Sequence, residues 1–371
     1  MMHGRAGGML NQETLKPRAL GETLARLGTY FGQYWYMIVL AVLFVIISTW
    51  TQVTTPELTG QATDCFLVPA GASAFGGFGA QTGSPSQQTA STCYLTTDDP
   101  SRLTLSRRII YNAYTLGGFE MTDPLTATNE QRIEGLFRLI LVMIALFVLG
   151  AVLTGATFFT MAWTGQHVLR VLRVKVFEQL HRLSLSYYSQ HEAGDLMSRI
   201  TNDTSAIEQA FSFALVNVFS GILLLVWVAY NMVTTNAPFA LLSLSVAPVM
   251  FIATWYFSEQ ARKAFRVSRE EIGNVNAELQ ESIAAVREVQ AFNRADENIE
   301  QFKEVNAANR DANVRAVAYT SALAPALEAL SYVALAIVTG VGGWYLLRGQ
   351  SLLGTTVTLG LVVTFLGYVQ R

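Results

Sequence analysis

The sequence L-S-L-S-Y-Y-S-Q-H-E-A-G-D-L-M-S-R-I-T-N-D, from Leu183 to Asp203, is a polar turn between two long helical segments. Before it, an apolar run over 136–163 continues without a break signal into the amphipathic, basic stretch 168–183. After it, the amphipathic stretch 196–208 leads into the apolar run 211–233 without an intervening proline. Each arm has about 40 residues, or about 60 Å as a helix, whereas a bilayer core needs only about 20 residues. We therefore expect half of each arm, and the turn itself, to lie outside the membrane.

The composition is that of a membrane protein. Of the 371 residues, 51% are hydrophobic and 14% are charged, whereas about 25% of residues are charged in soluble domains. The formal net charge of -2 gives no indication of a nucleic-acid partner. The sequence therefore predicts an all-α membrane protein in which the positions of the charges carry the information.

Residues 1–20 lack the apolar core and the cleavage site of a signal peptide, and we expect a disordered cytoplasmic lead there. Apolar residues at helical spacing predict an amphipathic elbow helix over 21–34, with a simple first turn of the next span as the alternative. Six membrane spans are predicted, at about 35–58, 136–163, 211–233, 239–257, 321–347 and 356–371. The last is shorter than the roughly 20 residues that a span needs, so we expect the sequence to end within it.

The segment 60–135 is rich in Gly, Ser, Thr and Gln, a composition that does not order a long loop by itself. It contains both cysteines, Cys65 and Cys93, and we predict a disulfide between them. Closing that loop is worth about 3 kcal/mol in the chain-entropy model. A small cap is predicted around 103–114. The alternative is a flexible insertion with two free thiols.

A second long hairpin is predicted over 258–320. Apolar residues from Ile272 to Val289 repeat at steps of three and four, and polar and charged residues, mostly glutamates, occupy the other face, as in a helix that packs on other helices outside the bilayer. The turn falls near 291–296. Basic residues gather in this hairpin and in the first one, 164–210, so the positive-inside rule predicts that both are cytoplasmic. The N-terminus is then cytoplasmic and the insertion 60–135 is extracellular.

At this point the sequence resembles the transmembrane domain of ATP-binding-cassette (ABC) exporters, multidrug or lipid exporter type. The family's first intracellular loop reads approximately L-x-x-L-x-x-x-Y/F-F/Y-x-x-x-x-x-G-D/E-L-x-S-R-x-x-x-D. This chain matches it at Leu180, Leu183, Tyr187, Tyr188, Gly194, Asp195, Leu196, Ser198, Arg199 and Asp203. The second loop, approximately N-A-x-x-x-E-S-x-x-G-x-x-x-V-x-x-F-x-x-E, is matched at Asn276, Ala277, Glu281, Ser282, Val289 and Phe292. The sequence departs from this pattern at Ala285, where glycine is common, and at Asp296, which falls only approximately at the place of the later acid.

The resemblance covers about 21–371 without the insertion, and it implies the six-helix exporter fold with long cytoplasmic helical extensions. It implies a plasma or bacterial inner membrane location and alternating access. A short coupling helix at each turn docks on a nucleotide-binding domain, in the same chain or in a separate subunit. That domain binds ATP and Mg, this segment binds neither, and a second transmembrane domain completes a homo- or heterodimer. The coupling residues that it implies are Tyr187, Tyr188, His191, Gly194, Asp195, Arg199, Asp203, Val289, Phe292 and Asn293.

Three local expectations accompany these coupling residues. Gly194 is expected to allow a sharp re-entry into a helix, and Asp195 to complement the helix dipole. Arg199 and Asp203, spaced i, i+4, are expected to form a weak ion pair that stabilises the long helical arm after the turn.

Polar groups within spans are costly, so Glu328 and Asn217 indicate a substrate path, and the aromatic Trp227 is expected to line it. For Glu328 the alternative is a hydrated carboxylate near the interface, and for Trp227 an aromatic that packs or faces lipid. The sequence has no G-x-x-x-x-G-K-[ST], no zinc-ligand spacing and no catalytic triad. We therefore expect no ATPase or metal site in this segment and an ATP-hydrolysing translocase as the intact protein. Two other functions stay open: a proton-driven transporter of the same fold, with Glu328 central, and a non-transporting regulatory membrane subunit.

Overall fold

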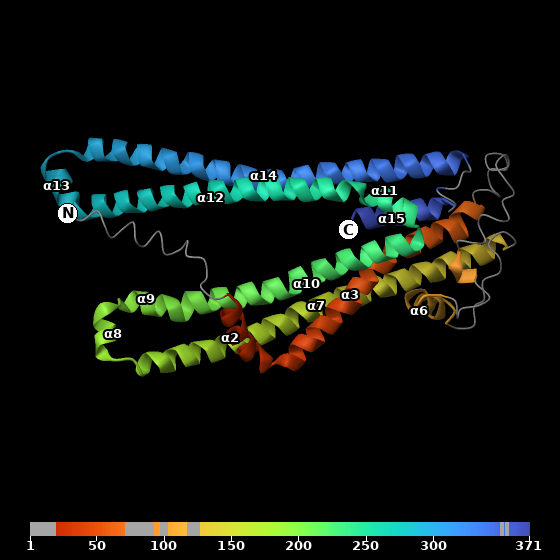
Figure 1. The fold of residues 1–371 in the computed structure, drawn as a ribbon, viewed down its shortest axis with the longest axis horizontal. Coiled ribbons are helices and arrows are strands. Elements are labelled where there is room, and N and C mark those ends of the chain that lie inside the picture. Colours follow the sequence, from red (N-terminus) through yellow and green to blue (C-terminus); the bar gives the residue numbers. More distant parts are fainter. Residues whose placement is uncertain (1–19, 71–92, 97–102, 117–126, 349–351, 353–355) are drawn as a thin grey trace. The chain divides into compact units, whose positions relative to one another are not determined.

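The computed structural model describes residues 20–70, 93–96, 103–116, 127–348, 352 and 356–371. The lead predicted over 1–20 lies outside this part, except for its last residue. Every element over the described residues is a helix (Figure 1). The helical stretches long and apolar enough to cross a membrane are Trp35–Ala70, Asn129–His181, Ala193–Thr235, Ala237–Ala284 and Ala295–Arg348, with the shorter apolar helix Leu359–Val369 in addition. The predicted all-α membrane fold is therefore confirmed.

The chain divides into two compact units, which are described separately. The first comprises residues 1–55 and 137–228, and the second comprises residues 56–136 and 229–371. Three helices run from one unit into the other: they are α3 (Trp35–Ala62), α7 (Asn129–His181) and α10 (Thr204–Thr235).

In the first unit, α7 and α10 form the arms of a hairpin (Figure 1). The turn between them holds two short helices, α8 (Leu185–Gln190) and α9 (Ala193–Ser198), and a π-helical segment, Arg199–Asp203. No proline falls within the 53 residues of α7, so nothing in the sequence interrupts this arm.

The short helix α2 (Leu20–Gly32) lies where the elbow helix is predicted. Phe31 anchors it: its side chain is 1% exposed and packs against α7 at Val168 and Leu172. The Phe31 ring also stacks on Phe211 of α10, with the ring centroids 3.5 Å apart. A single aromatic residue thus fastens α2 to both arms of the hairpin.

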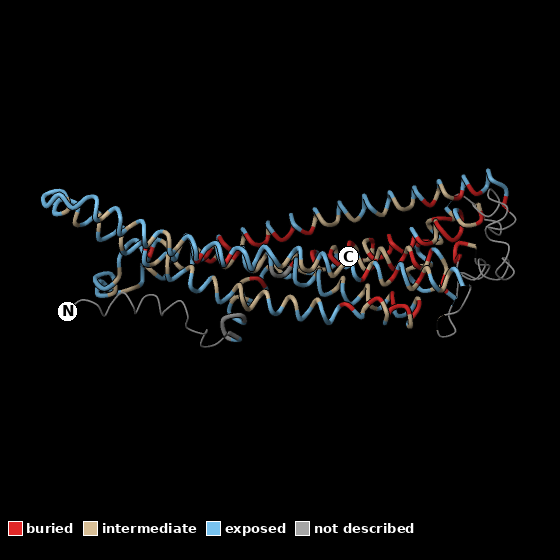
Figure 2. Tube along the Cα trace, turned by 90° about the horizontal axis from the view of Figure 1, so that it is seen from above, coloured by how far each residue is buried: buried red, intermediate tan, exposed pale blue. Residues whose placement is uncertain are grey.

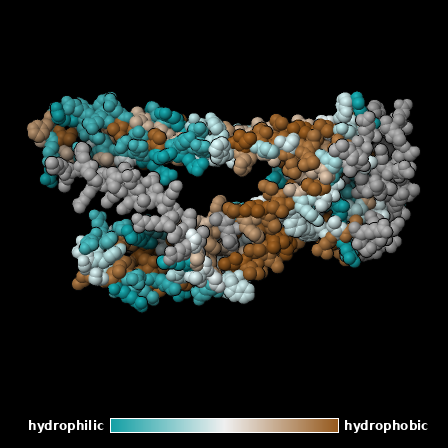
Figure 3. All heavy atoms as spheres, in the orientation of Figure 1, coloured by the Kyte–Doolittle hydropathy of each residue, from teal (hydrophilic) through white to brown (hydrophobic). Residues whose placement is uncertain are grey.

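In the second unit, α12 (Ala247–Ala284) and α14 (Ala295–Arg348) pack side by side along their length (Figure 1). The turn between them contains α13 (Val286–Ala291). In each hairpin, exposed residues gather toward the turn (Figure 2), and hydrophilic residues gather toward the same end (Figure 3). This is the pattern expected of an arm that is part membrane helix and part polar extension.

The predicted span 239–257 is not one continuous helix. Asn236 caps α11 (Ala237–Ser243) by accepting a hydrogen bond from the Phe239 N–H, at 3.1 Å. A short 3-10 turn, Leu244–Val246, then separates α11 from α12. Pro248 lies in the first turn of α12, where its missing N–H leaves no helical bond unmade, so the break falls just before it.

The insertion contributes a small cap to the second unit. We use "cap" for the π-helical segment Thr63–Leu67, the 3-10 turn Tyr94–Thr96 and α6 (Leu105–Tyr114). A disulfide joins Cys65 to Cys93, and α6 occupies most of the range in which a small cap is predicted. The rest of the insertion, at 71–92, 97–102 and 117–126, lies outside the described residues.

A partly buried ion pair connects the cap to α3. Arg107 Nε of α6 lies 2.6 Å from Glu57 Oε1, with side-chain exposures of 32% and 8%. The Arg107 guanidinium also lies over the Tyr94 ring, 5.4 Å from its centroid. Burial lowers the pKa of Arg107, but attraction to Glu57 outweighs it and the net pKa is raised. Burial and the same carboxylate raise the pKa of Tyr94 well above its ordinary value.

Asp64 fastens the cap to α15 (Leu359–Val369). Its two carboxylate oxygens accept hydrogen bonds from the Thr358 hydroxyl and the Gly360 N–H, each at 2.7 Å. A carboxylate at a helix N-terminus is favoured by the free N–H groups and the helix dipole. Gly60 packs so closely on Gly360 that a Cβ at position 60 would lie 2.5 Å from the Gly360 carbonyl oxygen.

Candidate functional site

The first hairpin turn presents α8 as a short, exposed helix. Its two tyrosines are held by different contacts: Tyr187 stacks on His191 with centroids 4.0 Å apart, and the Tyr188 hydroxyl donates to the Leu180 carbonyl at 2.6 Å. Extended residues at Ser184 and His191 bound the helix on both sides. Leu185 is 88% exposed at its start. The tyrosines are thus fixed in orientation and still accessible.

After α8, two local expectations are wrong. Arg199 pairs with Asp195, at 3.0 Å, and not with Asp203. The π-helical segment Arg199–Asp203 widens the helix, so the i, i+4 spacing no longer places Asp203 beside Arg199. Gly194 lies in the first turn of α9, where a Cβ would meet nothing within 4 Å, so the turn does not depend on glycine there. Asp195 does lie in the first turn of α9, as expected.

The second turn is built around α13. The helix ends at Ala291, and Asn293 takes a left-handed conformation with φ 51°, which asparagine tolerates better than most residues. The Arg294 N–H then donates to the Val289 carbonyl at 2.9 Å, which closes the turn. Phe292 is 75% exposed at its tip. The return helix α14 is tied to α12 by Asn298, whose amide donates to the Ser282 hydroxyl at 3.1 Å.

The two turns therefore share one design. Each contains a six-residue helix between long arms, and each presents apolar or aromatic side chains to solvent. Apolar side chains held exposed at a rigid tip are typical of a protein-binding surface.

The three residues predicted for a substrate path are divided between the two units, with Asn217 and Trp227 in the first and Glu328 in the second. Asn217 is exposed on α10, and its amide donates to the Phe213 carbonyl at 3.0 Å. Trp227 is half-buried on the same helix. Glu328 belongs to the other unit, where it is exposed and accepts a hydrogen bond from the Tyr332 hydroxyl at 3.2 Å. Their role stays a prediction.

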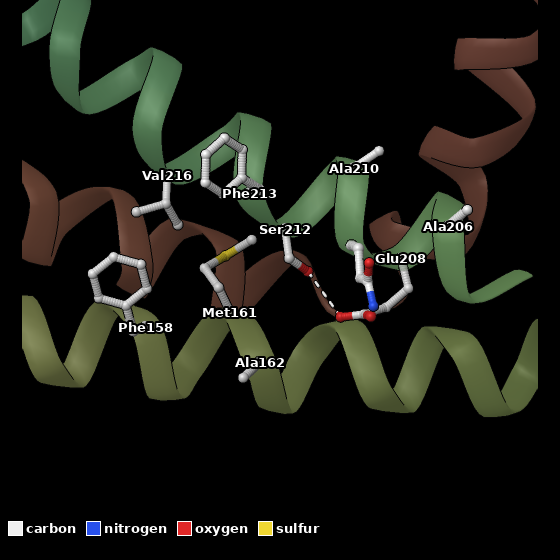
Figure 4. Close-up of a pocket in the computed structure, with 10 residues that line it drawn as sticks. Phe158, Met161, Ala162, Ala206, Glu208, Ala210, Ser212, Phe213 and Val216 are labelled. Atoms are coloured by element: carbon white, nitrogen blue, oxygen red, sulfur yellow. Dashed lines mark hydrogen bonds between the residues drawn. The ribbon is translucent and has the colours of Figure 1, made fainter. Parts of the chain in front are cut away.

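An open cavity of about 650 Å³ lies between α7 and α10 (Figure 4). Most of its wall is apolar. From α7 it is lined by Phe158, Met161 and Ala162, and from the α10 side by Ala206, Glu208, Gln209, Ala210, Ser212, Phe213 and Val216. All of these residues belong to the first unit.

Glu208 is the one acidic residue among the described residues that line this wall, and sequence reasoning missed it. It is only 7% exposed, and Ser212 donates a hydrogen bond to its Oε1 at 3.2 Å. The sequence carried a signal: Glu208, Ser212 and Val216 recur every four residues and share a helix face that leads into an apolar run. Among the described residues, no group of three or more potential metal ligands gathers.

Comparison with known proteins gives a consistent result. A family model described as the ABC transporter transmembrane region matches residues 37–369. The chain is 27% identical over 254 residues to an uncharacterized ABC transporter ATP-binding protein, YknV, of Bacillus subtilis, covering 68% of this chain and 41% of that protein. It is 27% identical over 237 residues to a fatty acid ABC transporter ATP-binding/permease protein of Mycobacterium tuberculosis, covering 63% and 36%.

A third relative is an ATP-dependent lipid A-core flippase of Syntrophus aciditrophicus. It is 26% identical over 195 residues, covering 53% of this chain and 32% of the relative. In each of these three comparisons the matched region spans less than half of the relative's length.

Proposed function

The chain belongs to the ABC transporter transmembrane region family, and from this premise we propose that it is the membrane-spanning half of an ATP-driven exporter. In this proposal it moves an amphipathic substrate across the membrane by alternating access. One observation carries the proposal: two six-residue helices, α8 and α13, stand at the turns of long helical hairpins, with an exposed tyrosine in α8 and the exposed Phe292 directly after α13. Surfaces of this kind suit docking on a moving partner, and the names of the relatives include an ATP-binding function.

The proposed partner is a nucleotide-binding domain, in the same chain or in a separate subunit, which holds ATP and Mg. ATP binding and hydrolysis in that domain supply the free energy. In this chain, Tyr187, Tyr188 and His191 of the first turn and Val289, Phe292 and Asn293 of the second receive the motion. The ion pair between Asp195 and Arg199 supports the first turn, and Gly194 and Asp203 belong to the same proposed coupling set. A second transmembrane domain completes the exporter, and the difference in ATP affinity between the two conformations drives the change.

The orientation follows from the same proposal. The basic residues of the two hairpins support a cytoplasmic location for both turns and for the N-terminus. The cap, with its disulfide, then faces the oxidising side of the membrane. Glu328, Asn217 and Trp227 are proposed to contact substrate along the path.

The test is the double variant Tyr187→Ala/Tyr188→Ala in the intact transporter, reconstituted in proteoliposomes. We expect normal insertion and ATP hydrolysis but a large loss of transport per ATP, because the anchors of the first docking surface are gone. Tyr36→Ala, an exposed tyrosine on α3 away from the turn, is the matched control. Unchanged coupling would refute the docking role, and flux that follows a proton gradient without ATP would refute ATP-driven export.

A further inference from the structure

We propose that the cavity between α7 and α10 binds an amphipathic cation, and that Glu208 selects its positive charge. The proposal deepens the export function proposed above, on which its role as a substrate site rests. The binding itself is a property of the first unit and can be measured without transport.

The size and walls of the cavity suit a compact apolar molecule. Its volume of about 650 Å³ lies within the range of about 300 to 1,000 Å³ that is common for small-molecule sites. Phe158 and Met161 face it from α7, and Phe213 and Val216 face it from α10 (Figure 4). Aromatic faces attract cations, and the flexible methionine thioether adapts to irregular ligands.

The carboxylate of Glu208 supplies the charge. It is more than nine-tenths buried, and its hydrogen-bond partner among the described residues is the neutral Ser212 hydroxyl. None of the ion pairs formed by the described residues includes it. A carboxylate removed from water without a cation is costly, so a positively charged ligand in the cavity would provide the missing partner.

The local packing keeps this carboxylate in place. Gly165 of α7 lies directly opposite: a Cβ there would overlap Glu208 Oε1 and would lie 2.6 Å from Ser212 Oγ. The glycine therefore leaves the space that the carboxylate and the hydroxyl occupy at the cavity wall. A ligand with an acidic headgroup would meet a like charge here, and we expect the site to reject it.

The experiment uses two probes of the same shape and opposite charge, tetraphenylphosphonium and tetraphenylborate. Equilibrium binding of each is measured to the intact, nucleotide-free transporter in nanodiscs. We expect saturable binding of tetraphenylphosphonium, and binding of tetraphenylborate at least about tenfold weaker. This comparison needs no variant and does not depend on one folding correctly.

The variant Glu208→Gln keeps the shape and the hydrogen bond from Ser212 but removes the charge. We expect it to weaken tetraphenylphosphonium binding about tenfold, the size of a charge-assisted interaction, and not to weaken tetraphenylborate binding. Glu178→Gln, which removes an exposed carboxylate of α7 outside the cavity, should change neither.

The proposal is overturned if wild-type protein shows no saturable tetraphenylphosphonium binding or does not discriminate between the probes. It is also overturned if Glu208→Gln and wild type bind the cation equally. ATP-driven flux is measured on the same preparations. Absence of flux with intact, charge-selective binding would refute the export function and leave the site, so the two failures are distinguishable.

Discussion

The ion pair between Glu57 and Arg107 offers a test of what holds the cap to α3. The perturbation is Arg107→Met, which keeps much of the apolar stem and removes the guanidinium. In the variant, the Glu57 carboxylate stays buried, with 8% side-chain exposure, and loses the donor that lies 2.6 Å from it. The structure therefore predicts a loss of stability that comes mainly from the buried, uncompensated Glu57 carboxylate and less from the lost contact itself.

The magnitude follows from burial. Removing one partner of a fully buried pair costs about 3 to 5 kcal/mol, because the other charge is left uncompensated. Since the Arg107 side chain is 32% exposed, water reaches the pair and reduces the cost. We expect Arg107→Met to lower the free energy of unfolding by about 2 to 3 kcal/mol. The double variant Glu57→Gln/Arg107→Met should recover much of this loss, because it leaves no buried charge.

The assay is reversible unfolding in mixed micelles of the wild type, both single variants and the double variant, all at one pH. We expect an interaction energy of about 1 to 3 kcal/mol from this cycle. Arg108→Met, the adjacent exposed arginine on α6, should change stability by no more than about 0.5 kcal/mol. Additive effects within about 0.5 kcal/mol, or equal losses at positions 107 and 108, would show that the pair does not hold the cap.

Three further changes test other contacts of the second unit. Gly60→Ala should destabilise the protein by about 1 to 3 kcal/mol, because its Cβ would lie 2.5 Å from the Gly360 carbonyl oxygen. Gly340→Ala is the control, because a Cβ there would meet nothing within 4 Å and should not destabilise the protein. Equal thermal midpoints for the two variants would refute this prediction. Cys65→Ser/Cys93→Ser removes a disulfide between residues 28 positions apart and should lower the free energy of unfolding by about 3 to 4 kcal/mol. Dithiothreitol should lower the stability of the wild type by the same amount and should not affect the variant. Asn236→Ala should lower the free energy of unfolding by about 1 kcal/mol, because it removes the side-chain acceptor for the Phe239 N–H at the N-terminus of α11. Asn236→Ser should restore most of this stability, and a full loss with serine would contradict the N-capping role of Asn236.

The long-range plan of the molecule was predictable because it depends on periodicity and length. Helices α7 and α14 need only an unbroken apolar and amphipathic pattern, and the turns need only polar residues between two such patterns. The details of the first turn were not predictable in this way. A π-helical segment adds a residue to one turn, so the i, i+4 rule gave Arg199 the wrong partner.

The cap and the cavity depend on contacts between residues that are far apart in the sequence. Asp64 and Gly360 meet across almost the whole chain, and no local pattern in either segment indicates the other. Glu328 was predicted from the sequence as a candidate for the substrate path because a carboxylate within a membrane span is costly and rare. Glu208 lies at the end of a span, where a charge looks ordinary, and only packing against Gly165 and Ser212 shows that it is buried.

The cavity lies between α7 and α10, the same two helices that form the arms of the first hairpin. Below the cavity, Arg173 of α7 donates to the Ser205 hydroxyl at 2.9 Å, and that contact lies one helical turn from Glu208. The Phe31 ring, stacked on Phe211, holds the pair from another side. Because these two contacts hold α7 and α10 together, we expect a displacement of α8 to move both helices, and the cavity wall with them, as one body. In the proposed function, cation binding in the cavity and docking at the turn are therefore coupled, and such coupling is reciprocal: a change in cation affinity on docking requires an equal change in docking affinity on cation binding.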